Sequence, residues 1–215
     1  MQSPIELSEI ITVKICHDLA GPIGALNNGV ELLRDKSNTS HIQEESLNLI
    51  EISSQESVHK LMYFRQCYGT ASFDGEHSIE ALRDMAVNYF KRSKITIDWQ
   101  LPKATFGTTT IPTVTTVAAK VVLNAILVIA NSLVYGGTIK VRIARDFQRI
   151  PFSVRGEGKL VKISEDVLAP FTHPIDSIPV TVKNLQSSLI AKFLHDAGIK
   201  FSLTHDDSFI ELNVA

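Results

Sequence analysis

The sequence has little cysteine, no surplus of either charge and no apolar run of transmembrane length. Its two cysteines, Cys16 and Cys67, lie far apart in 215 residues, which argues against a disulfide framework and against a thiolate metal site. The 21 basic and 23 acidic residues give a formal net charge of -2, so the sequence lacks the basic surplus typical of nucleic-acid-binding proteins. The longest apolar stretch, 121–134, is broken by two asparagines and is shorter than the roughly 20 residues that cross a bilayer. With no secretory pattern at the N-terminus, these absences predict a cytoplasmic protein that binds neither nucleic acid nor membrane.

What remains is an ordinary globular composition, and the first third of the chain has the periodicity of two long helices. Apolar residues recur at steps of three and four, which predicts a helix over about residues 5–35. A polar turn follows, and Thr39 or Ser40 is expected to cap a second helix that ends at Gly69. The apolar stripe expected on this second helix consists of Leu47, Ile50, Val58, Leu61, Phe64 and Tyr68.

Two amphipathic helices alone cannot bury both of their apolar stripes. Two copies of such a hairpin can do so by forming a four-helix bundle, so we expect a homodimer. The alternative is that the hairpin packs against the C-terminal half of its own chain.

A polar stretch over residues 70–77 separates the two halves, which predicts a helical domain at residues 1–72 and a second domain at residues 73–215.

The second half of the chain alternates between helix and strand patterns. Helices are expected at residues 78–91, 113–133 and 180–196, and strands at 94–101, 138–145, 151–155, 199–204 and 209–214. A mixed sheet with helices on one face is an α/β sandwich of the α+β class. The predicted architecture is therefore an all-α hairpin followed by an α+β domain.

The segment 16–22 reads Cys-His-Asp-Leu-Ala-Gly-Pro and lies within the first predicted helix. His17 is about 200° around the helix from the nearest stripe residues, so its imidazole should face solvent, whereas the preceding cysteine is expected to be a small buried residue. Gly21 and Pro22 disfavour a helix interior by about 1 and about 3 kcal/mol, and such a cost usually accompanies a kink or a functional need. Gly21 and Gly24 leave a shallow surface on which another protein can approach the histidine.

The chemistry of this segment is compatible with phosphoryl transfer, but a plain surface histidine fits the pattern at least equally well. Unperturbed imidazole has a pKa of about 6.5, so an exposed His17 is largely neutral at cytoplasmic pH and can act as a nucleophile. Lys14 shares the helix face three residues earlier and is a candidate contact for phosphoryl oxygens. Asp18 receives only a supporting role, because residues i and i+1 point in different directions on a helix.

Two stretches of the sequence resemble motifs of a known family. His17-Asp18-Leu19 with Pro22 is similar to the H-box of sensor histidine kinases, in which the phosphorylated histidine lies on the first helix of a dimeric hairpin. Residues 120–143 resemble the N-box helix and the following strand of the kinase ATP-binding domain. Together the two matches extend the resemblance to both halves of the chain.

The nucleotide-binding motifs of that kinase domain are incomplete here. Asn124 matches the first asparagine of the N-box, whereas Val128 replaces the second, which ligates magnesium in the kinases. Where the kinases have Asp-x-Gly-x-Gly, residues 154–158 read Val-Arg-Gly-Glu-Gly and lack the aspartate that binds adenine. Where they have a glycine-rich lid, residues 179–185 contain no glycine. This combination is similar to the ChpT-type histidine phosphotransferases of alphaproteobacteria.

The resemblance implies a DHp-like hairpin in a dimeric four-helix bundle, followed by a degenerate HATPase-like α/β sandwich of the GHKL class. It further implies that His17 accepts a phosphoryl group from a receiver-domain aspartate of a hybrid histidine kinase and passes it to a response regulator, without ATP. No cofactor or metal of the chain's own is expected, because Mg²⁺ comes with the receiver domain. Gly21, Pro22, Gly24 and Asn28 are the candidate contacts for receiver domains. Two alternatives remain open: an ATP-dependent histidine kinase core with divergent motifs, and a non-catalytic scaffold.

Overall fold

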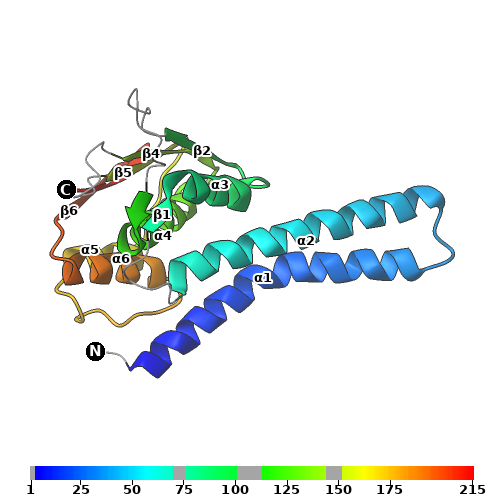
Figure 1. Cartoon of the computed structure of the whole chain (residues 1–215), viewed down its shortest axis with the longest axis horizontal. Helices are drawn as coiled ribbons and strands as arrows, with labels where there is room; N and C mark the ends of the chain where they lie inside the picture. The colour runs from blue at the N-terminus through cyan, green and yellow to red at the C-terminus, as the bar shows by residue number, and fades with distance from the viewer. Residues whose placement is uncertain (1–2, 70–75, 101–112, 144–151) are drawn as a thin grey trace.

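The chain forms a long helical hairpin whose base packs against a compact α/β half (Figure 1). The computed structural model describes residues 3–69, 76–100, 113–143 and 152–215. The hairpin consists of α1 (Pro4–Arg34) and α2 (Ser40–Tyr68), and the α1–α2 turn lies far from the α/β half. The predicted boundary between residues 72 and 73 lies outside the described residues.

Local capping explains where the two long helices begin and end. Ser3 and Glu6 form a capping box at the start of α1, in which each side chain accepts a hydrogen bond from the other residue's backbone N–H. Thr39 caps α2 by accepting from the backbone N–H of Ile42, and Gly69 ends it. These bounds agree with the sequence prediction to within about one residue, as expected when caps are recognisable.

The two helices of the hairpin cross closely, and part of the apolar stripe of α2 is exposed in the single chain. A Cβ at Gly29 would lie 2.8 Å from Cγ1 of Ile50, so glycine permits the helices to approach. Of the stripe predicted for α2, Leu47, Val58 and Leu61 are about half exposed in the single chain. The predicted burial of Cys16 is wrong, because its side chain is exposed on α1.

The α/β half is built on a five-stranded sheet of order β2-β4-β5-β7-β6, in which β2 runs parallel to β4 and the other pairs are antiparallel. Its elements are β1 (Glu76–Ser78), α3 (Ile79–Phe90), β2 (Ile95–Gln100), β3 (Thr113–Thr115), α4 (Thr116–Ser132), β4 (Gly137–Ile143), β5 (Phe152–Gly158), α5 (Glu165–Thr172), α6 (Leu185–Asp196), β6 (Phe201–His205) and β7 (Phe209–Val214). The helices cover one face of the sheet, and the base of α2 packs on α3 and α4 from the side away from the sheet (Figure 1). The predicted α+β sandwich is confirmed.

Differences from the predicted elements have local causes. The helix expected from residue 180 begins at Leu185, because the Asn184 side chain binds residues 179–181 into a turn. Helix α5 was not predicted, because Pro170 lies in its last turn and proline disfavours a helix interior. The short strands β1 and β3 pair with each other and were too short to give a periodicity.

Buried hydrogen bonds join the base of the hairpin to the α/β half. The hydroxyl of Tyr63 donates to the carbonyl of Leu123 at 2.8 Å, and the amide of Gln186 lies 2.9 Å from the Tyr68 hydroxyl. Burial raises the pKa of both phenols, so they remain neutral. Because directional bonds inside a core favour one geometry, the hairpin base has a defined orientation on α4.

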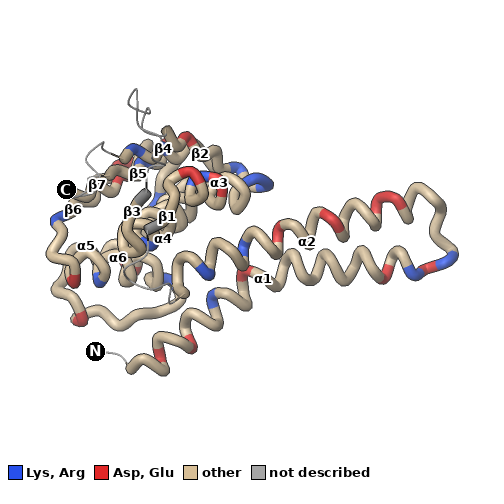
Figure 2. Tube along the Cα trace, in the orientation of Figure 1, with Lys and Arg blue, Asp and Glu red and all other residues tan. Residues whose placement is uncertain are grey.

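Charge is mixed over the described surface. Basic and acidic residues are interspersed along both the hairpin and the α/β half (Figure 2). Among the described residues, no helix is both long enough and apolar enough to cross a membrane.

Candidate functional site

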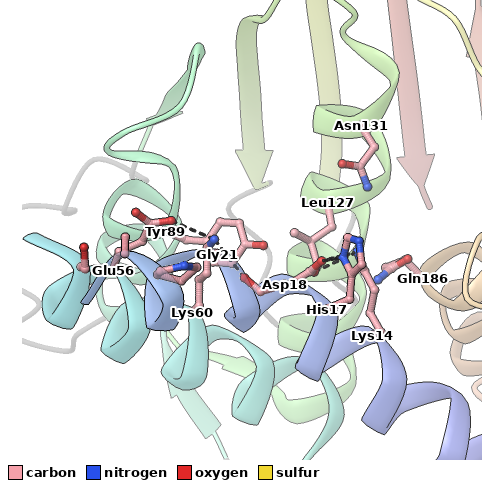
Figure 3. Close-up of a pocket in the computed structure, with 13 residues that line it drawn as sticks. Lys14, His17, Asp18, Gly21, Glu56, Lys60, Tyr89, Leu127, Asn131 and Gln186 are labelled. Carbon is pink, nitrogen blue, oxygen red and sulfur yellow. Dashed lines mark hydrogen bonds and ion pairs between the residues drawn. The ribbon is translucent and has the colours of Figure 1, made fainter. Parts of the chain in front are cut away.

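The imidazole of His17 lies beside a pocket of about 470 Å³ between the hairpin and the α/β half (Figure 3). Its side chain is 81% exposed, as the helical position predicted. The pocket is lined by residues of α1 and α2 and, from the α/β half, of α3, α4 and α6. Both halves of the chain therefore border the surroundings of the histidine.

Asp18 contacts the ring of His17, contrary to the expectation for adjacent helix positions. Its Oδ1 lies 3.0 Å from Nδ1 of the imidazole, and its side chain is only 15% exposed. A carboxylate accepts hydrogen bonds, so in a neutral imidazole this contact selects the tautomer with the proton on Nδ1 and the lone pair on Nε2. The side chain reaches backwards far enough to orient the ring, although the two Cβ atoms point in different directions.

Lys14 also lies in this group of side chains, where it pairs with the Asp18 carboxylate. Its Nζ lies 2.8 Å from Oδ2 and 3.1 Å from Oδ1 of Asp18, one helical turn later (Figure 3). An i,i+4 pair of this kind holds the carboxylate in place. The structure therefore shows Lys14 paired with Asp18, and its contact with phosphoryl oxygens stays a prediction.

Three of the four predicted partner contacts share the open face of α1 with His17. Gly21, Gly24 and Asn28 are exposed, and a Cβ added to either glycine would meet nothing within 4 Å. Pro22 differs, because it is buried, although it also lines the pocket.

The positions that correspond to the kinase nucleotide motifs are used for packing. Asn124 is fully buried in α4 and donates to the Lys120 carbonyl at 2.9 Å, and Val128 is buried on the same helix. A Cβ at Gly156 of β5 would collide with Cγ2 of Ile129. That glycine therefore permits α4 to pack closely on the sheet, which is a sufficient reason for its presence without a phosphate.

The segment that replaces the kinase lid is closed on itself. The Asn184 side chain accepts from the backbone N–H of Thr181 at 2.7 Å and donates to the carbonyl of Pro179 at 3.1 Å. Asn184 is itself buried. A backbone cradle for phosphate requires N–H groups that point to open space, and the N–H of Thr181 is already bound within this turn.

Sequence reasoning predicted none of the pocket residues that come from outside α1, among which Lys60 and Tyr89 carry polar groups. Lys60 of α2 places its Nζ 3.1 Å from the carbonyl oxygen of Asp18, and Tyr89 of α3 lines the same pocket. Burial, followed by the negative charges of Asp18 and Glu56, raises the pKa of Tyr89, so its phenol stays protonated. The sequence contained one indication of such a residue. Pro22 has no backbone N–H, so the carbonyl four residues earlier in the helix needs a hydrogen-bond donor from elsewhere.

Metal binding is not indicated by any cluster in the part of the chain that the structure describes. Within residues 3–69, 76–100, 113–143 and 152–215, no three His, Cys, Asp or Glu side chains lie together as a metal site requires.

Comparison with known protein families gives a match over more than half of the chain. The family model described as Histidine phosphotransferase C-terminal domain matches residues 79–209. The protein phosphotransferase ChpT of Brucella abortus (strain 2308) is 24% identical over 207 residues, which cover 94% of this chain and 91% of that protein. A solved bacterial phosphotransferase structure superposes with a TM-score of 0.81 at 21% identity, covering 100% of this chain and 98% of that one. The nucleotide-free catalytic domain of the histidine kinase ThkA aligns with 65% of this chain and 92% of its own at a TM-score of 0.46 and 15% identity. The chain belongs to the histidine phosphotransferase family.

Proposed function

We propose that His17 is the phosphoacceptor of this phosphotransferase, which takes a phosphoryl group from a receiver-domain aspartyl phosphate and passes it to a second receiver. The observation that carries this proposal is the hydrogen bond between Nδ1 of His17 and Asp18, which leaves an exposed Nε2 with its lone pair available. The upstream receiver belongs to a hybrid histidine kinase and the downstream one to a response regulator.

The geometry supports an in-line transfer to Nε2. The Nε2 lone pair attacks phosphorus, an N–P bond forms, and the P–O bond to the receiver aspartate breaks with its electrons returning to that carboxylate. The ring becomes positively charged, and the Asp18 carboxylate stabilises it through the Nδ1 proton. The receiver supplies Mg²⁺, so this chain contributes alignment and one nucleophile. Transfer to the second receiver is the reverse of these steps.

The packed nucleotide positions support an ATP-independent reaction. Val128 offers no ligand to a hard cation, and Val154 faces the core at the position of the adenine-binding aspartate.

The test incubates the protein with a phosphorylated receiver domain and, separately, with Mg-ATP. We expect acid-labile label from the receiver and none from ATP. Label from ATP would support the kinase alternative, and label from neither donor would support the scaffold alternative.

Replacing the neighbouring acid tests the role of the Nδ1 hydrogen bond. Asp18→Asn keeps the size of the side chain but removes the charge that stabilises the imidazolium, so we expect the single-turnover rate of transfer to fall on the order of 10²-fold. Rapid-quench measurement with saturating phosphorylated receiver gives this rate. A rate within about twofold of the wild type would show that Asp18 does not take part.

The exposed apolar residues of α2 support the homodimer. Leu47, Val58 and Leu61 lie on one side of the helix and are half exposed in a single chain, as expected for a bundle that needs a second copy. Leu61→Glu combined with Val58→Glu should reduce the mass in solution from twice 23.7 kDa to 23.7 kDa by light scattering. Val134→Glu is the control, since Val134 is similarly exposed but lies off the hairpin. A wild-type protein that is already monomeric would contradict the proposed dimer.

A further inference from the structure

Pro22 leaves a carbonyl without a helical donor next to the proposed phosphoacceptor. The proline lies inside α1, and the helix continues on both sides of it. In a regular helix the backbone N–H of residue 22 would donate to the carbonyl of residue 18, but proline has no N–H. The oxygen that loses its helical donor therefore belongs to Asp18, the residue that orients His17.

A lysine from the other helix donates to this oxygen. Lys60 of α2 places its Nζ 3.1 Å from the Asp18 carbonyl and 2.8 Å from Oε1 of Glu56. Its side chain is only 19% exposed and lines the pocket beside His17 (Figure 3). Two acceptors on different helices fix the ammonium group, so it is anchored rather than extended into solvent.

We infer that Lys60 is a positioning residue, which supplies the hydrogen bond that Pro22 removes and so holds Asp18 against His17 during transfer. Asp18 is then fixed at two points: its carboxylate by Lys14 and its carbonyl by Lys60. Through these contacts the orientation of the imidazole depends on α2 as well as α1. The inference rests on the proposed role of His17 as phosphoacceptor.

If Lys60 were only an ion-pair partner of Glu56, the expected result of mutation would be different. The effect of removing the lysine would then not depend on the residue at position 22. If Lys60 replaces a missing backbone donor, its importance must depend on Pro22. In Pro22→Ala the new backbone N–H can donate to the Asp18 carbonyl, which makes the lysine redundant. The two residues should therefore be energetically coupled.

A double-mutant cycle on these two residues tests the inference. We expect Lys60→Met to lower the single-turnover rate of His17 phosphorylation at saturating receiver by about tenfold, the size of coupling between contacting residues. The receiver concentration at half-saturation should change less than about twofold, because the lysine positions the ring rather than binding the partner. In the Pro22→Ala background, Lys60→Met should lower the rate by less than about twofold. Lys60→Arg keeps donors at this place and should retain most of the rate.

A spectroscopic measurement gives a second readout that needs no transfer. Nitrogen-15 correlation spectra of the His17 ring should show the Nδ1–H tautomer in the wild type and a larger Nε2–H fraction in Lys60→Met. The matched control is Lys192→Met, which removes another i,i+4 lysine partner, here of Asp196, and should change neither the rate nor the tautomer. Thermal unfolding of each variant identifies any loss of fold.

Two results would overturn the inference. One is a Lys60→Met variant whose transfer rate and tautomer match the wild type. The other is a loss of rate on Lys60→Met that is the same with and without the Pro22→Ala substitution. If no receiver phosphorylates the wild-type protein, the proposed function fails instead, while the tautomer spectra of the four cycle variants still decide whether Lys60 positions the ring.

Discussion

Replacing His17 with alanine is expected to abolish phosphorylation by receiver domains while leaving the fold intact. Among the described residues that line the pocket, the imidazole is the group that offers an exposed ring nitrogen as nucleophile, so the rate should fall by at least about 10³-fold. Because the side chain is mostly exposed, its removal opens no cavity and the unfolding temperature should change little. Transfer of label from a phosphorylated receiver, read by gel, measures the effect.

His41→Ala is the matched control for this experiment. His41 is also an exposed helical histidine beside an acid, with its Nε2 3.8 Å from Glu45, but it lies at the start of α2. The control should accept label at the wild-type rate. Label that persists in His17→Ala, or disappears in His41→Ala, would place the phosphoacceptor elsewhere.

Adding a side chain at Gly21 is expected to block transfer without destabilising the protein. A Cβ there meets nothing within 4 Å, and leucine favours a helix over glycine by about 0.8 kcal/mol, so Gly21→Leu should unfold at the same or a higher temperature. The same side chain lies one turn from His17 on the face that a receiver must approach. Because a displacement of about 1 Å can cost about 10²-fold in rate, we expect a loss of that order.

Thr12→Leu supplies the comparison on the same helix. Thr12 is exposed, but it lies about 140° around α1 from His17, so the added bulk faces away from the proposed docking surface. This variant should transfer at the wild-type rate. If Gly21→Leu also transfers normally, the receiver does not approach across this face.

Local signals explain how much of the fold the sequence predicted. The ends of α1 and α2 follow from short-range capping by Ser3, Thr39 and Gly69, and such capping residues can be recognised in the sequence. The exposure of His17 follows from helical geometry alone. The half-exposed α2 stripe agrees with the expectation that two helices alone cannot bury both apolar stripes, but the sequence does not show which copy or element covers it. The exposure of Cys16 was missed because its place beside the stripe lies at the edge of the buried sector.

The candidate site was predicted in part, for a similar reason. His17, Asp18 and Lys14 are neighbours in sequence, and the structure brings them into one hydrogen-bonded chain. Lys60 comes from 42 residues later, and Tyr89 from a different half of the chain. Their positions depend on how the hairpin closes and how α3 packs on its base, which no periodicity encodes. The contact between Asp18 and the ring was not predicted, because side-chain reach, rather than Cβ direction, brings its carboxylate to the imidazole.

The most direct test of the relay is a two-step transfer with isolated phosphoprotein. The wild-type chain is labelled by one phosphorylated receiver, purified, and mixed in a single turnover with a second, unphosphorylated receiver and Mg²⁺. We expect label to leave His17 and to appear on the aspartate of the second receiver in equal amount, and we expect that ATP neither labels the chain nor is required. Label that passes only to water, or that enters the chain from ATP, would contradict a relay through His17.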